Sequence, residues 1–250
     1  LITSTHDTKR SADVRARIGA LTLPQFCEDW AALAHRWVPS APDPGAGFLV
    51  LQTLLGAHPI EPLDRLDAYL EKALREAKQQ TNWVDQDEAF ETAVKDWARG
   101  LLDDTEFLAT FDPLCARVET VGRKAALGQV LLKLTVPGIP DIYAGDELDF
   151  RALVDPDNRR PVDFAARRQA LEDPPAKLAL ITAVLGLRAR RASAFAGTYD
   201  PVAAPAGCCA FVRGGEVLVV VPFCEDVDGT IEAAGFDPVP AAQLAIYETR

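Results

Sequence analysis

The 250-residue sequence has no methionine, only three histidines and no long hydrophobic run. Its longest apolar stretches, such as residues 217–223, are far shorter than the roughly 20 residues needed to cross a bilayer, so we expect no membrane segment. The chain begins at Leu1 and contains no methionine at which translation could start. We therefore expect it to be a fragment of a longer protein.

Basic residues are also in short supply. Lysine and arginine together number 26 against 37 aspartates and glutamates, which gives a formal net charge of -11. This balance argues against nucleic acid or an anionic membrane surface as a partner, and it favours a neutral or cationic ligand. The hydrophobic fraction of 48% is that of an ordinary soluble globular protein.

Cysteines are few, odd in number and lack the spacing of a zinc site. No C-x-x-C pair occurs, and no histidine stands at metal-ligand spacing from a cysteine. We therefore predict no metal, no cofactor and no disulfide framework, but buried free thiols in a reducing cytoplasm. The cysteines are Cys27, Cys115, Cys208, Cys209 and Cys224.

The pattern from residue 23 to about 134 predicts several helices, because apolar residues recur every three or four positions. One apolar stripe runs from Phe26 to Trp37, a second from Leu63 to Leu74 and a third from Phe90 to Leu101. Tryptophans at this spacing are typical of a helical core, and sugar-binding platforms are the less favoured interpretation. Residues 39–47 predict a loop.

The second half of the chain predicts strands as well as helices. A short β-prone run at 139–143, followed by an amphipathic helix at 177–191, predicts a βα unit. A turn rich in glycine separates two β-prone runs and predicts a hairpin. The predicted hairpin strands are 208–212 and 217–221, and further strands are predicted near 230–233 and 244–247.

A dense polar cluster, L-I-T-S-T-H-D-T-K-R, opens the chain ahead of a helix predicted from Ser11. In a β/α barrel the active site is built where strands run out into loops, so such a cluster after a short strand suits ligand binding. A His-Asp dipeptide by itself is more typical of an ordinary solvated turn.

The motif T-S-T-H-D-T-K-R resembles the fourth conserved segment of the α-amylase superfamily, which ends the seventh barrel strand. G-I-P-D-I-Y-A-G-D-E, residues 138–147, resembles the segment at the eighth strand. T-H-D-T-K-R together with L-V-D-P-D-N-R-R-P-V-D-F, residues 153–164, looks like the malto-oligosyltrehalose synthase family. Residues 80–91 are similar to a segment of that family's helical insertion.

This resemblance implies an α/β fold: the C-terminal part of a (β/α)8 barrel, strands 7 and 8, with a large helical insertion and a C-terminal antiparallel β domain. Residues 1–22 would hold the end of strand 7 and its helix, and 23–128 the insertion. Residues 129–192 would hold strand 8, the catalytic-face loop and helix 8. The β domain would occupy 193–250.

The resemblance also implies an activity. The enzyme would convert the reducing-end α-1,4 linkage of maltodextrins to an α-1,1 linkage by intramolecular transglucosylation with a retaining mechanism. The nucleophile and general acid would come from barrel strands 4 and 5, outside this sequence, so the chain alone is expected to be inactive. An enzyme that releases trehalose from the product is the implied functional partner. The alternatives are a hydrolase of the same fold and a non-catalytic module that binds glucan or a protein.

Within the resemblance, Asp7 matches the carboxylate that stabilises the transition state and His6 matches the histidine that touches the same sugar. Lys9 and Arg10 could reach the acceptor glucose or form salt bridges at the barrel rim. The 153–164 loop could contact substrate or form self-bonded Asx turns. Its candidate binding residues are Asp155, Asp157, Asn158 and Arg159. Asp146 and Glu147 are interpreted as bracing the barrel mouth.

Overall fold

The structure is a computed structural model that describes residues 1–204, 206–222, 235–239 and 245–249. The chain forms two compact units. The helical unit comprises Ser4–Gly122 and Arg151–Pro161, and the sheet unit comprises Leu1–Thr3, Arg123–Phe150 and Val162–Arg250.

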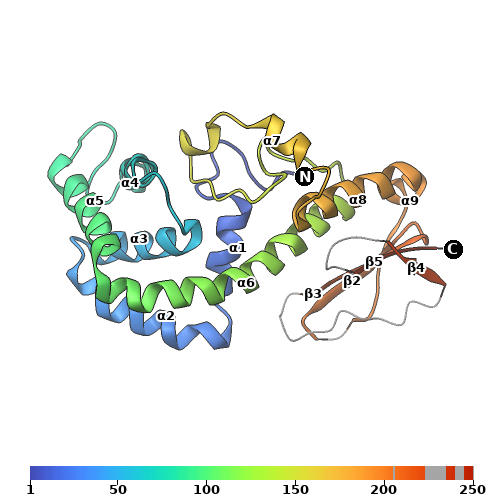
Figure 1. The fold of residues 1–250 in the computed structure, drawn as a ribbon, viewed down its shortest axis with the longest axis horizontal. Helices are drawn as coiled ribbons and strands as arrows, with labels where there is room; N and C mark the ends of the chain where they lie inside the picture. The colour runs from blue at the N-terminus through green and yellow to red at the C-terminus, as the bar shows by residue number, and fades with distance from the viewer. Residues whose placement is uncertain (205, 223–234, 240–244, 250) are drawn as a thin grey trace. The chain divides into compact units, whose positions relative to one another are not determined.

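The helical unit is built from α-helices, several of which have a first turn capped by a side chain. Ser11 accepts a hydrogen bond from the backbone N–H of Val14, and Asp87 accepts one from Phe90. Such caps satisfy donors that the first turn of a helix leaves unpaired. The elements are α1 (Ala12–Ala20), α2 (Pro24–Trp37), the 3₁₀ helix η1 (Val38–Ser40), α3 (Pro44–Ala57), α4 (Asp64–Ala77), α5 (Glu88–Asp103), the first part of α6 (Thr105–Thr135) and the 3₁₀ helix η2 (Asp157–Arg159) (Figure 1).

The three predicted apolar stripes are confirmed as the buried faces of α2, α4 and α5, except for Leu63, which is exposed and precedes the first residue of α4. Leu33, Leu70 and Val94 are buried in the common core of the unit. The loop predicted at 39–47 is wrong in its second half, because α3 already begins at Pro44. Asp43 caps this helix by accepting the N–H of Ala46, and proline suits a first helical turn.

In its described residues, the sheet unit combines helices with an antiparallel sheet of five strands in the order β1-β2-β3-β5-β4. The predicted hairpin is confirmed, with Gly214 and Gly215 at positive φ in its turn. Helix α8 confirms the predicted amphipathic helix, and β5 matches the strand predicted near 244–247. The elements are α7 (Phe164–Gln169), α8 (Ala176–Arg190), α9 (Ala192–Ala196), β1 (Tyr199–Pro201), β2 (Cys208–Arg213), β3 (Val217–Pro222), β4 (Phe236–Pro238) and β5 (Ala245–Thr249).

Strand β3 is buried along its whole length because both faces of the sheet are covered. Val219 and Val221 belong to a cluster with Leu131 of α6 and Leu180 of α8. Leu218 belongs to a second, smaller cluster on the other face of the strand. The strand predicted near 230–233 lies outside the described residues.

The strand predicted at 139–143 is wrong, and so is the short strand predicted at the start of the chain. Both segments lack strand assignment. Leu1 nevertheless donates its N–H to Ile139 O and accepts a hydrogen bond from Asp141 N at 2.9 Å. This exchange has the pattern of a parallel pair, but a strand needs a longer row of partners along its neighbour.

The described cysteines differ in their exposure. Cys115 is buried, and burial raises the pKa of its thiol to about 12. Cys27 is exposed on α2, which contradicts the prediction that the thiols are buried. Its position is at the solvent side of an amphipathic helix. Cys208 and Cys209 are half-buried in β2, and Cys224 lies outside the described residues.

The described part of the chain contains neither a membrane-spanning helix nor a cluster of metal-binding side chains. No helix there is both long and apolar enough to cross a membrane. Within the same residues, no cluster of three histidine, cysteine, aspartate or glutamate side chains could hold a metal ion.

An ion pair between α4 and α5 gives the helical unit a pH-sensitive contact. Arg75 donates two hydrogen bonds to the buried Glu91 carboxylate, at 2.9 and 2.8 Å. These bonds hold the pKa of Glu91 below its ordinary value. Since the folded pKa is lower than the unfolded one, the pair stabilises the fold above about pH 4.3, and this contribution is lost as the pH falls through the folded pKa.

We therefore expect Glu91→Gln to lower the melting temperature at neutral pH. The difference in melting temperature between this variant and the wild type should become smaller below about pH 4.3. Thermal melts followed by circular dichroism over this pH range measure the difference. Glu88→Gln is the matched control, because Glu88 is exposed in the first turn of the same helix. A difference that stays constant with pH would show that the charge of Glu91 does not stabilise the fold.

Candidate functional site

The His-Asp dipeptide occupies the centre of a tight turn that two threonines close. Thr8 N donates to Thr5 O at 3.1 Å, and Thr5 N donates to the Thr8 hydroxyl at 2.8 Å. The two hydroxyls are 3.0 Å apart, and Asp7 N donates to Thr5 Oγ1 at 3.2 Å. The backbone N–H groups of Thr5, Asp7 and Thr8 are thus paired within the turn, and none of these bonds uses the His6 or Asp7 side chain.

The His6 and Asp7 side chains are accessible and close to each other. His6 Nε2 lies 3.1 Å from Asp7 Oδ2, and the side chains are 50% and 78% exposed. An imidazole N–H can donate a hydrogen bond, while an ionised carboxylate accepts them. The pair can therefore form hydrogen bonds with a ligand rich in hydroxyl groups.

The predicted catalytic-face loop lies directly against this turn, within the helical unit. Ser11 N donates to Ala152 O at 2.8 Å, and Arg10 and Leu153 form an antiparallel bridge. Asn158 is buried, and its side-chain amide donates to the carbonyls of Thr5 and His6, both at 3.0 Å. Asn158 therefore positions the turn that carries His6 and Asp7.

Asp157 is buried and its carboxylate is occupied by protein groups. It accepts hydrogen bonds from Arg65 Nε at 2.7 Å, from Arg65 Nη2 at 3.1 Å and from Leu153 N at 2.7 Å. The Asp157 side chain is only 2% exposed. It fixes the loop to helix α4 rather than presenting a carboxylate to solvent.

Lys9 and Arg10 extend from the turn toward two helices of the same unit. Lys9 forms an ion pair with Glu76 near the end of α4, although half of its side chain stays exposed. Arg10 Nη2 donates to the Thr53 hydroxyl at 2.9 Å and to Leu49 O at 3.3 Å, both on α3. Arg10 thus braces the site, whereas Lys9 retains access to solvent.

Asp155 and Arg159 form the exposed side of the loop. Asp155 Oδ1 lies 3.2 Å from Arg159 Nε, and its other oxygen lies 3.8 Å from Lys72 Nζ. Asp155 N also donates to His6 O at 3.3 Å. The Arg159 side chain is 53% exposed, so this pair can meet a ligand beside His6 and Asp7.

Helix α4 supplies a polar face that the sequence analysis missed. Arg65 holds Asp157, Lys72 lies near Asp155 and Glu76 holds Lys9. Spacings of seven and four residues place these three side chains on one face of a helix. The charged residues at this spacing are visible in the sequence, but the apolar stripe that predicts the helix does not point to them.

Asp146 and Glu147, in the sheet unit, form ion pairs. The Asp146 side chain is 1% exposed, with Oδ1 at 2.6 Å from Lys177 Nζ and Oδ2 at 3.5 Å from Lys133 Nζ. Glu147 Oε2 lies 3.1 Å from Arg167 Nε. A carboxylate as deeply buried as Asp146 supports the fold and does not meet a ligand.

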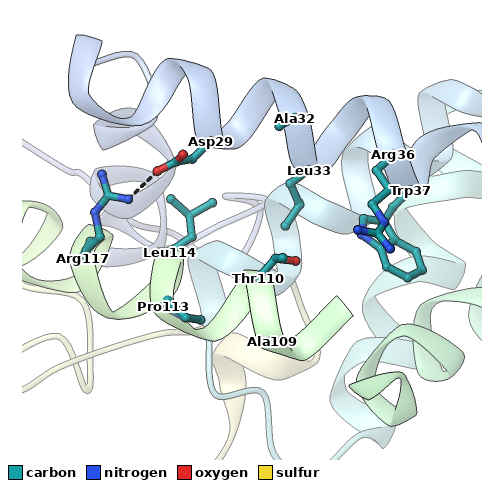
Figure 2. Close-up of a pocket in the computed structure, with 10 residues that line it drawn as sticks. All are labelled: Asp29, Ala32, Leu33, Arg36, Trp37, Ala109, Thr110, Pro113, Leu114 and Arg117. Atoms are coloured by element: carbon teal, nitrogen blue, oxygen red, sulfur yellow. Dashed lines mark hydrogen bonds and ion pairs between the residues drawn. The ribbon is translucent and has the colours of Figure 1, made fainter. Parts of the chain in front are cut away.

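A pocket of about 340 Å³ between α2 and α6 lies apart from the candidate site residues, none of which lines it. Figure 2 shows the ion pair between Asp29 and Arg117 across the two helices. The lining residues are Asp29, Ala32, Leu33, Arg36, Trp37, Ala109, Thr110, Pro113, Leu114 and Arg117.

Comparison with known proteins shows relatives of one kind, although no protein-family model matches the chain. A Mycobacterium tuberculosis protein named "Putative maltooligosyl trehalose synthase" is 41% identical in an alignment 233 residues long, which covers 87% of this chain and 30% of the relative. The chain is homologous to part of the maltooligosyl trehalose synthases.

Solved structures of maltooligosyl trehalose synthases agree with this relation. One crystal structure matches the whole chain with a TM-score of 0.90 at 28% identity, over 39% of its own length. The synthase from Arthrobacter ramosus matches 88% of the chain with a TM-score of 0.79 at 34% identity, over 31% of its own length. The chain thus spans about a third of these synthases and shares their helical architecture with a small antiparallel sheet.

Proposed function

We propose that this chain is the C-terminal part of a maltooligosyl trehalose synthase and supplies one side of its active site. The complete enzyme would convert the reducing-end α-1,4 linkage of a maltodextrin to an α-1,1 linkage and so leave a trehalose end. The observation that carries the proposal is the exposed His6-Asp7 turn, held by the 151–160 segment, in a chain 41% identical to a protein named for that reaction.

Asp7 acts in this proposal as a transition-state stabiliser. Retaining glycosidases pass through an oxocarbenium-like transition state, and hydrogen bonds to the sugar hydroxyls strengthen as its charge develops. The exposed Asp7 carboxylate can accept such bonds, and His6 can donate one to the same sugar. The nucleophile and the general acid would be supplied by residues outside this sequence.

The remaining candidate residues divide between contact and support. Lys9, Asp155 and Arg159 keep exposed polar atoms and are proposed to contact the substrate. Asn158 and Asp157 are buried beneath the turn and the loop, so we propose that they act by positioning the residues that touch the sugar. Arg10 takes a bracing role because its guanidinium donates to the Thr53 hydroxyl and to Leu49 O.

The barrel interpretation is part of the proposal. In the complete protein, the segments around Leu1 and 139–141 would be the ends of barrel strands 7 and 8. The parallel-type hydrogen-bond exchange between them supports this, although neither segment is a strand in the described residues. The assignment of 23–128 to a helical insertion and of 193–250 to a β domain rests on the resemblance. An enzyme that removes trehalose from the product would be the functional partner.

The deciding experiment is an assay of the complete protein with maltohexaose as the substrate. We expect reducing ends to disappear while chain length is conserved, because the transfer is intramolecular, and a trehalose-ended product to be identified by NMR. The isolated 250 residues should form no product. Release of glucose would identify a hydrolase instead, and product formation by the isolated chain would overturn the assignment of the nucleophile to residues outside it.

A further inference from the structure

The loop at residues 78–87, between α4 and α5, displays two large apolar side chains to solvent. Trp83 is 49% exposed and Val84 is 97% exposed. The other tryptophans, Trp30, Trp37 and Trp97, all pack against the core of the helical unit. Trp83 therefore requires a different explanation from the core role that fits the rest.

Hydrogen bonds within the loop fix the backbone that carries Trp83. Asn82 Oδ1 accepts hydrogen bonds from Val84 N at 2.9 Å and Asp85 N at 2.8 Å, and Asn82 N donates to Asp85 O at 3.0 Å. Thr81, which is buried, accepts from Asp87 N at 3.0 Å and donates to Glu91 at 2.6 Å. A side chain on such a loop is preorganised, which lowers the entropic cost of binding a ligand.

A fixed cation supports the indole ring of Trp83. The guanidinium carbon of Arg75 lies 5.1 Å from the ring centroid, and Arg75 is itself held by two hydrogen bonds to Glu91. An arginine over an aromatic face is a favourable contact. The half-exposed ring thus has a partner on the protein side and apolar surface left for a ligand.

Helix α4 connects this ring with the candidate active site. Arg75 contacts Trp83, and the next residue, Glu76, forms the ion pair with Lys9. Consecutive residues point about 100° apart around a helix whose diameter with side chains is about 10–12 Å. Trp83 and Lys9 therefore contact neighbouring sides of the same turn of α4, within the helical unit.

We propose that Trp83 is a stacking platform for a glucose unit of the glucan chain, and that this unit is a different one from the sugar held by His6 and Asp7. This proposal rests on the proposed function. The apolar face of a pyranose ring can cover the indole, while exposed amides nearby can bond its hydroxyls. Gln79, Gln80 and Gln86 are exposed on the same loop. Gln86 lies beside Trp83, with its Nε2 donating to Trp83 O at 3.4 Å, so its amide oxygen can accept a hydrogen bond from a sugar hydroxyl. The acidic neighbours Asp85 and Glu88 disfavour a polyanionic ligand.

The test uses the complete enzyme and maltodextrins of increasing length. Trp83→Ala should raise KM for long chains by about tenfold, which is the loss of affinity expected when one buried aromatic face is removed. The kcat should stay within about twofold of the wild-type value. Trp83→Phe should retain most of the affinity. The shortest substrate should show no change, because it does not reach the platform. Val84→Ala is the matched control on the same loop and should behave as wild type.

Three results would overturn the platform. They are an unchanged KM for long chains, an equal rise in KM at every chain length, and a maltoheptaose-induced change in tryptophan fluorescence that is as large in Trp83→Phe as in wild type. The fluorescence measurement applies even if Trp83→Ala does not fold. Failure of the proposed function is distinct, because the wild-type enzyme would then form no trehalose-ended product.

Discussion

Replacement of Asp7 by asparagine in the complete protein is expected to lower kcat for the trehalose-ended product by about 10²–10³-fold. Asparagine keeps the shape of the side chain but loses its negative charge, so its hydrogen bonds cannot strengthen as positive charge develops on the sugar. KM should change much less, because the substrate in its ground state is uncharged. Steady-state kinetics with maltohexaose provide both constants.

The control for this variant is a carboxylate remote from the turn. Asp103 is exposed at the end of α5, so Asp103→Asn should keep the wild-type kcat. The melting temperature of Asp7→Asn should match that of wild type, since the side chain is 78% exposed. A kcat for Asp7→Asn equal to that of wild type would remove Asp7 from the catalytic machinery.

The largest expected effect on stability belongs to Asp157. Replacement by alanine would leave the Arg65 guanidinium, 10% exposed, without its anionic partner and would remove the acceptor of Leu153 N. Breaking a buried ion pair in this way costs about 3–5 kcal/mol. Chemical denaturation monitored on a probe in the helical unit should show this loss, with a fall in activity because the loop beside His6 is released.

Asp155 provides the comparison within the same loop. Its side chain is 31% exposed, and its ion pairs with Arg159 and Lys72 span 3.2 and 3.8 Å. Exposed pairs of this kind contribute under about 1 kcal/mol, so Asp155→Ala should unfold nearly as wild type does. Similar stabilities for the two variants would show that the buried pair of Asp157 is not a main support of the loop.

The helices of this chain were predictable because their signal is local. Apolar residues at helical spacing, as in Phe26–Trp37, fix both the element and the face that it buries. The hairpin around Gly214 and Gly215 was predictable for the same reason, since the turn chemistry is contained in adjacent residues.

The segments that were mispredicted depend on residues far away in the sequence. A β-prone run such as 139–143 becomes a strand only when neighbouring backbone groups pair with it, and Leu1 supplies a single such neighbour in the described structure. The start of α3 at Pro44 was missed because its loop composition hid the cap provided by Asp43.

The sequence motifs predict which residues belong to the candidate site, but they do not predict the contacts between those residues. The His6-Asp7 pair and the 153–164 loop were identified by resemblance, and the structure brings them together. The contacts that join them, from Asn158 to the carbonyls of Thr5 and His6, link residues about 150 positions apart. No periodicity in the sequence encodes such a contact, so the positioning roles of Asn158 and Arg65 appear only in three dimensions.

In the Thr5–Thr8 turn, the groups that hold the backbone differ from the side chains that we propose to contact the sugar. The shape of the turn depends on the two threonine hydroxyls and on the amide of Asn158, whereas the His6 and Asp7 side chains contribute little to it. The side chains at positions 6 and 7 can therefore be exchanged without rebuilding the backbone beneath them, so a substitution here changes the chemistry of the turn and not its stability.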